Sequence, residues 1–139
     1  PGETEKDFND TINLVKEVNF INSYSFIYNS RPGTPSSNLE GVEKKIQKER
    51  LLILQNLLED IQIKENKNQV GKTKEVLIEN KAKNKKNYFG RIENSTPVII
   101  SKADDQDLGK IINVKINSYN RNTLFGSKEN IEKEVAAWC

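Results

Sequence analysis

Five short segments that alternate apolar and polar residues follow one another in the second half of the chain, and they restrict the fold more than any other feature. An alternating period of two places one side of a segment in a core and the other in solvent, as in a β-strand. Short strands at regular spacing, separated by polar turns such as residues 81–86 and 103–109, are typical of a small antiparallel barrel. The five segments are Glu75–Glu79, Tyr88–Ile92, Val98–Ile100, Ile111–Ile116 and Thr123–Phe125.

Helical patterns come before these segments. Residues 4–18 predict an amphipathic helix, in which Thr4 can cap the start and Asp7 lies where a capping box needs it. Residues 42–63 predict a longer helix with one apolar stripe. Between them, residues 24–28 are aromatic and β-branched and predict a strand, followed by a loop over residues 29–35 that contains two prolines. A helix, a strand and a loop in this order indicate an α/β unit.

Composition excludes several classes of chemistry. The chain has one cysteine, Cys139, and no histidine. A disulfide framework, a Cys/His metal site made by this chain alone and Ser–His or Cys–His catalysis are therefore excluded. We assign no catalytic and no metal-binding residue. No apolar stretch is long enough to cross a membrane and no secretory signal opens the chain, so we expect a cytoplasmic location.

Charge is distributed unevenly along the chain. Residues 64–128 contain 14 Lys and Arg against 7 Asp and Glu, whereas residues 1–63 contain 7 against 10. A basic segment flanked by acidic ones favours a polyanionic partner for the strands. The chain is also rich in lysine, asparagine and isoleucine, as the products of AT-rich genomes are, and codon bias is the alternative explanation for part of this lysine.

Two groups of motifs resemble the radical-SAM methylthiotransferases. The first is Pro1-Gly2-Glu3-Thr4 with Asp7-Phe8 and Thr11, followed by residues 24–28 and by Arg31-Pro32-Gly33-Thr34-Pro35. The second group consists of Lys48-Glu49-Arg50-Leu51 with Leu54-Gln55, Val70-Gly71-Lys72-Thr73, Gly90-Arg91, Leu108-Gly109-Lys110 and Asn122-Thr123-Leu124-Phe125-Gly126. This group resembles the family's linker helix and its terminal TRAM domain, and the resemblance spans roughly residues 1–127.

The resemblance implies an α+β fold: the last β/α units of a radical-SAM TIM-like barrel, then a five-stranded antiparallel TRAM barrel. We expect the first part and the linker helix over residues 1–66, the RNA-binding barrel over 67–127, and a tail of unknown role over 128–139, helical from Lys128 to Trp138. The complete family enzyme uses S-adenosylmethionine and two 4Fe-4S clusters. Their cysteine ligands are expected upstream of Pro1, so this part alone is expected to be inactive.

Three residues of the first part are candidates for ligand contacts. The resemblance places Gly2 and Glu3 beside S-adenosylmethionine, where a glycine allows close approach and a carboxylate can accept a hydrogen bond. The alternative is a turn followed by an acidic helix start. Arg31 lies in a loop stiffened by Pro32 and Pro35, and its guanidinium could bind an RNA phosphate or could pair with a neighbouring acid.

The basic strands carry the remaining candidates. Small barrels bind nucleic acid by placing the phosphate backbone over basic side chains while aromatic rings stack on bases. Tyr88, Phe89, Tyr119 and Phe125 are the aromatic candidates, although a barrel this small also needs such residues in its core. The predicted RNA-binding residues of the strands are Lys72, Lys74, Arg91, Lys110 and Arg121.

Several functions remain compatible with these residues. Within the family, the chain most resembles the enzymes that add a methylthio group to isopentenyladenosine next to the tRNA anticodon. The alternatives are a methylthiotransferase for threonylcarbamoyladenosine in tRNA or for a ribosomal protein, and a non-catalytic RNA-binding module. For the hypotheses in which the chain belongs to a tRNA-modifying enzyme, we expect tRNA as the partner, no contact with a membrane, and a monomeric chain.

Overall fold

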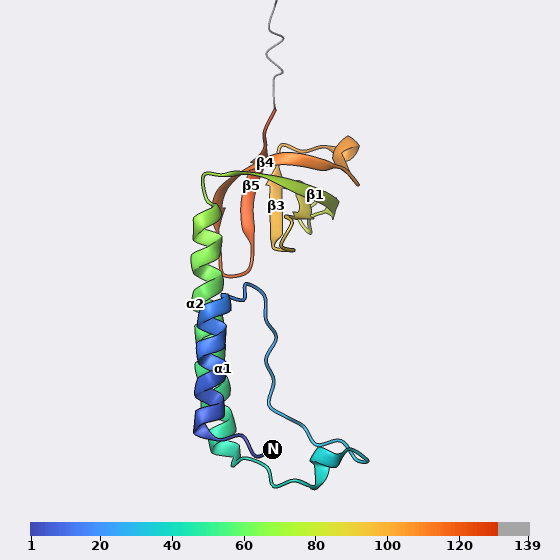
Figure 1. The fold of residues 1–139 in the computed structure, drawn as a ribbon. Helices are drawn as coiled ribbons and strands as arrows, with labels where there is room; N and C mark the ends of the chain where they lie inside the picture. The colour runs from blue at the N-terminus through green and yellow to red at the C-terminus, as the bar shows by residue number, and fades with distance from the viewer. Residues whose placement is uncertain (131–139) are drawn as a thin grey trace, which may run out of the picture. The chain divides into compact units, whose positions relative to one another are not determined.

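A computed structural model of the chain describes residues 1–130 (Figure 1). Contacts divide it into two compact units, with the boundary between Gln62 and Ile63. The elements in chain order are α1 (Glu5–Val18), η1 (Pro35–Asn38), α2 (Lys44–Gln69), β1 (Thr73–Lys81), β2 (Tyr88–Arg91), β3 (Pro97–Ser101), η2 (Asp105–Asp107), β4 (Ile111–Tyr119) and β5 (Leu124–Lys128). The predicted tail over Lys128–Trp138 lies outside the described residues from position 131 onward, and Lys128 itself ends β5.

The start of α1 confirms the capping box. The Asp7 backbone N–H donates to the Thr4 hydroxyl at 3.2 Å, and the Asp7 carboxylate accepts from the Thr4 backbone N–H at 2.9 Å. These bonds to Thr4 lower the pKa of Asp7 below its ordinary value. The helix ends at Asn19, whose left-handed backbone (φ 57°) allows its N–H to bond back to Val15. Its buried residues are Phe8 and Val15.

The predicted strand over residues 24–28 is wrong, because this segment has no regular secondary structure. A strand requires a hydrogen-bonded neighbour, and the described residues of this unit provide none. The segment contacts α2 through Gln55, whose side-chain amide donates to the Ser25 carbonyl at 3.5 Å. Tyr24 and Phe26 are 91% and 82% exposed. Local β-propensity thus marks residues that are suited to a strand without supplying the partner strand.

The second helix runs further than its apolar stripe predicts. The stripe ends near Ile63, but α2 continues to Gln69. The last two turns bury polar side chains, since Asn66 and Gln69 are 1% and 6% exposed. A search for apolar periodicity cannot detect buried amides, which explains the early end of the predicted helix.

All five predicted strands are present, and they close into a barrel in the order β1-β2-β3-β5-β4. The pairs β1–β2, β2–β3, β4–β5 and β1–β4 are antiparallel, as expected. The pair β3–β5 is parallel, so the barrel is mixed and not purely antiparallel. β5 lies between β3 and β4, and alternation along a strand does not encode which strands become neighbours.

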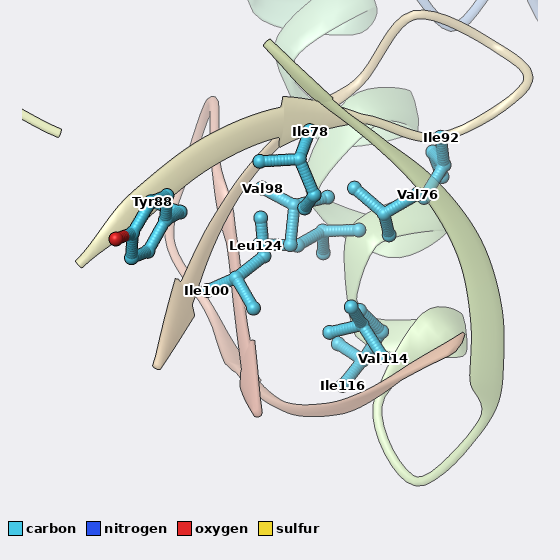
Figure 2. Close-up of a cluster of buried hydrophobic side chains, with 9 residues drawn as sticks. All are labelled: Val76, Ile78, Tyr88, Ile92, Val98, Ile100, Val114, Ile116 and Leu124. Atoms are coloured by element: carbon cyan, nitrogen blue, oxygen red, sulfur yellow. The ribbon is translucent and has the colours of Figure 1, made fainter. Parts of the chain in front are cut away.

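The barrel interior is filled by one cluster of side chains from all five strands and the residue after β2 (Figure 2). Figure 2 shows Tyr88 at the edge of this cluster, with its hydroxyl pointing away from the other side chains. The nine members are Val76, Ile78, Tyr88, Ile92, Val98, Ile100, Val114, Ile116 and Leu124.

Two inward-facing glycines allow the strands to come this close. A Cβ atom on Gly90 would collide with the Leu77 carbonyl oxygen and would lie 2.7 Å from Val76 Cγ1. A Cβ atom on Gly126 would lie 2.5 Å from the Lys115 carbonyl oxygen. Neither position has room for a side chain, which gives a packing reason for the glycines in the Gly90-Arg91 and Leu124-Phe125-Gly126 motifs.

Candidate nucleic-acid interface

Gly2 and Glu3, which were expected beside a cofactor, lie at the start of the first unit. Arg50 of α2 holds Glu3 in place. Arg50 Nη1 donates to Glu3 Oε1 at 2.8 Å and to the Glu3 carbonyl at 3.1 Å. The Arg50 guanidinium also lies over the Phe8 ring, 5.6 Å from its centroid. Gly2 has a positive φ of 76° and open space on its Cβ side, so its backbone is accessible to a ligand.

Glu3 and Arg50 line a cavity of about 220 Å³, together with residues that include Phe8 and Tyr28. Pockets for small molecules usually measure roughly 300–1,000 Å³. This cavity alone is therefore smaller than a typical small-molecule site. Arg31 is exposed and does not line this cavity; its carbonyl accepts hydrogen bonds from the backbone and hydroxyl of Thr34.

Three of the predicted RNA-binding residues lie where β1 begins and where β2 and β4 end. Lys72 precedes β1, Arg91 ends β2, and Arg121 lies in the β4–β5 loop. β1 is antiparallel to both β2 and β4, so the start of β1 and the ends of β2 and β4 face the same direction, but Arg91 is paired with Leu77, four residues along β1 from Thr73. The β4–β5 loop is held by Asn66 of α2, whose side-chain amide donates to the Asn120 and Arg121 carbonyls at 3.2 Å each.

The other two predicted residues are placed differently. Lys110 is exposed just before β4, and its carbonyl accepts from the N–H of Ile78, which is paired with Gly90 on β2. Lys74 is half-buried and is paired with the core residue Val114. Lys74 also shares the inward side of β1 with Val76, so it lies at the rim of the interior. The five basic residues of the barrel therefore do not form a single cluster.

Arg91 takes part in a local network. Its guanidinium lies over the Phe89 ring at 5.3 Å from the centroid. Its Nε is 3.3 Å from Glu79 Oε1, and its Nη1 donates to the Ser95 carbonyl at 3.1 Å. These contacts hold the guanidinium against the outer surface of β2.

An acidic turn at the end opposite Lys72 pairs with basic residues that the sequence alone leaves available for RNA. Lys128 donates to both carboxylate oxygens of Asp107 at 2.8 and 2.9 Å, and Lys81 lies 2.8 Å from Asp105. Burial opposes ionisation of Asp107, but the hydrogen bonds from Lys128 and from the Asp104 N–H outweigh it and lower the pKa of Asp107. The acidic turn thus reduces the positive charge at this end.

The same turn contacts the barrel core through a tyrosine. The Tyr88 hydroxyl donates to Asp105 at 2.6 Å. This hydrogen bond, followed by burial and by nearby carboxylates, raises the pKa of Tyr88 to about 12. The hydrogen bond from Lys81 and then that from Tyr88 lower the pKa of Asp105.

The four aromatic candidates are divided by the direction in which they point. Tyr88 belongs to the core, as the packing alternative predicts. Phe89 and Phe125 alternate with buried residues on their strands and are partly exposed on the outer surface. Tyr119, at the end of β4, is 37% exposed. The sequence left base stacking and core packing both open for these four residues, although the alternation around Gly90 could have indicated the outward direction of Phe89.

Residues 1–130 show neither a candidate metal site nor a membrane-spanning helix. Within this range, no group of three or more His, Cys, Asp or Glu side chains could hold a metal ion. None of the helices in the described part of the chain is long and apolar enough to span a membrane.

Comparison with known proteins identifies the barrel and its relatives. The TRAM domain family model matches residues 67–128. The tRNA-2-methylthio-N(6)-dimethylallyladenosine synthase of Pelagibacter ubique is 46% identical over 137 residues, which is 98% of this chain and 30% of the relative. This chain is homologous to the C-terminal, TRAM-containing region of the methylthiotransferases.

Other methylthiotransferases of the same name match in a similar way. The synthase of Ruthia magnifica is 41% identical over 91% of the chain, and that of Buchnera aphidicola is 42% identical over 93%. Each match covers 29% of the relative's length, so the chain spans less than a third of the methylthiotransferases that it resembles. The resemblance drawn from the sequence motifs is confirmed.

Proposed function

We propose that this chain is the tRNA-binding region of a methylthiotransferase that modifies isopentenyladenosine next to the tRNA anticodon. The observation that carries the proposal is the 46% identity to a tRNA-2-methylthio-N(6)-dimethylallyladenosine synthase, extending over 98% of the chain and both units. A TRAM barrel implies RNA binding, and the segment from Lys64 to Lys128 has twice as many basic as acidic side chains (14 against 7).

The roles of individual residues follow from their positions. Lys72, Arg91 and Arg121, where β1 begins and β2 and β4 end, would contact phosphates. Lys74 and Lys110 would add positive charge, and Arg31 would contact RNA from the first unit. In the complete enzyme, S-adenosylmethionine and two 4Fe-4S clusters would supply the radical and the sulfur. Gly2 and Glu3, with Glu3 oriented by Arg50, would form part of the S-adenosylmethionine site, while residues outside this chain would hold the clusters.

A chimaeric enzyme tests the whole proposal. The C-terminal region of the Pelagibacter ubique synthase is replaced by residues 1–139, and tRNA from cells that lack their own synthase is digested and analysed by mass spectrometry. We expect methylthio-isopentenyladenosine to reappear, whereas the relative truncated at the junction gives none. Methylthiolation of threonylcarbamoyladenosine instead, or of no nucleoside, would contradict the proposed substrate.

RNA binding is tested separately on the full chain with a tRNA anticodon stem-loop. If about four phosphates are contacted, affinity should fall on the order of 50-fold between about 50 and 200 mM salt, because counterions are released on binding. Lys72→Gln and Arg121→Gln should each weaken binding and flatten the salt dependence. Lys16→Gln, which removes an exposed lysine of α1, is the matched control. Salt-independent binding would speak against the phosphate contacts.

A further inference from the structure

The outer surface of β2, β3 and β5 carries a continuous row of apolar side chains. Phe89 is paired with Ile99, and Ile99 is paired with Phe125. All three alternate with core residues on their strands, so they point away from the interior, and all three are partly exposed. They are absent from the cluster that fills the barrel, so packing of the barrel core does not explain why these three residues are apolar.

Polar residues border this row on both sides. Across the bulge in β1, Asn80 is paired with Phe89, and across the bulge in β4, Ser118 is paired with Phe125. Neighbouring strands lie about 4.8 Å apart, so the two phenylalanine rings stand on strands about 10 Å apart, with Ile99 between them. An apolar centre with a polar border on the outer surface of the sheet can accept a planar, apolar partner.

Positive charge flanks this row of apolar side chains. Arg91, two residues after Phe89 on β2, lies over the Phe89 ring. The loop that leads into β2 carries Lys83, Lys85 and Lys86, all exposed. An apolar surface that carries aromatic rings and is bordered by cations is complementary to nucleobases joined by phosphates, because aromatic rings stack on base faces while basic side chains contact the backbone.

We propose that Phe89, Ile99 and Phe125 form a stacking platform for unpaired bases of the bound RNA, with Phe89 and Arg91 as its principal contacts. This inference rests on the proposed function, since it assigns the part of the RNA that the barrel recognises. Oligonucleotide-binding folds, which are also five-stranded barrels, use the outer surface of strands 2 and 3 in this way. Bases inside a duplex present no free face, so the platform selects single-stranded loops.

The test uses the full chain and an RNA hairpin whose loop contains 2-aminopurine, a base whose fluorescence is quenched on stacking. We expect the wild-type chain to quench the loop probe and to bind a fully paired duplex of equal length more weakly. Phe89→Leu keeps an apolar side chain but removes the ring. It should abolish quenching and weaken hairpin binding by about 5- to 100-fold, with the slope against salt unchanged.

Two further variants keep the test decisive. Phe89→Tyr should retain binding and quenching because it keeps the ring, and circular dichroism shows that each variant is folded. Phe26→Leu, which removes an exposed ring in the first unit, is the matched control and should behave as wild type. If the chain binds no RNA, both this inference and the proposed function are wrong. If wild-type hairpin binding persists in Phe89→Leu, or if the duplex binds equally well, the platform alone is overturned.

Discussion

At the scale of single residues, Tyr88 shows how one side chain can serve both the core and the surface. Its ring belongs to the apolar cluster, while its hydroxyl reaches Asp105 in the acidic turn. The aromatic character of position 88 is visible in the sequence, but its partner lies 17 residues away. The hydrogen bond therefore depends on β2 and the β3–β4 connection meeting at the same end of the barrel.

Tyr88 leads to a prediction about alkaline pH. Its pKa is raised from 10.0 to about 12 in the folded chain, so the unfolded chain loses this proton first. The contribution of the protonated Tyr88 side chain to the stability of the fold is therefore complete below pH 10 and is lost as the pH rises toward 12. We expect a tyrosinate absorbance phase near pH 12 that Tyr88→Phe removes and that the control Tyr119→Phe keeps. A phase that survives in Tyr88→Phe would show that the Asp105 hydrogen bond does not control ionisation.

At the scale of elements, the barrel strands depend on close approach at two glycines. Gly90 on β2 and Gly126 on β5 face inward, and a methyl group at either position would meet a neighbouring strand's backbone. Their types are visible in the sequence, and so are the strands that contain them. The reason why these two positions require glycine is not visible in the sequence, because the atoms that exclude a side chain there belong to β1 and β4.

Adding the methyl group tests this packing. Gly90→Ala and Gly126→Ala should each lower the free energy of unfolding by about 1–3 kcal/mol, because the strands must separate. For a domain of this size, each kcal/mol corresponds to about 4–8 °C in the melting temperature of the barrel. Gly41→Ala, at a position with open space and an ordinary φ, should leave the melting temperature unchanged. Equal melting temperatures for Gly90→Ala and wild type would contradict the collision.

At the scale of the whole molecule, the two units differ in how completely they bury their apolar residues. The second unit has a closed sheet around nine buried core residues. In the first unit the buried apolar residues are Phe8, Val15 and Leu58, while Tyr24 and Phe26 are almost fully exposed. A closed barrel leaves no unpaired strand edge, whereas the segment over residues 24–28 has backbone groups without a sheet partner.

The difference predicts unequal stability of the separated units. A polypeptide of residues 63–139 should unfold cooperatively and show dispersed amide signals in nuclear magnetic resonance spectra. A polypeptide of residues 1–62 should show partial helicity by circular dichroism and no cooperative melting transition, because it buries too little apolar surface to offset the loss of chain entropy. A sharp thermal transition in residues 1–62 would refute this expectation.

Local patterns in the chain were sufficient for α1 with its Thr4–Asp7 cap, for the position of all five barrel strands and for the excess of basic residues, because each depends on neighbours in sequence. Features that depend on contacts between distant residues were not predictable. Examples are the parallel pairing of β3 with β5, the continuation of α2 past its apolar stripe through the buried Asn66, and the absence of a strand at residues 24–28. The same reason explains why Lys81 and Lys128 are paired with acids and why Phe89 points outward beside Arg91. These properties arise from which strands and turns become neighbours when the barrel closes, and the barrel closes through hydrogen bonds between segments far apart in the chain.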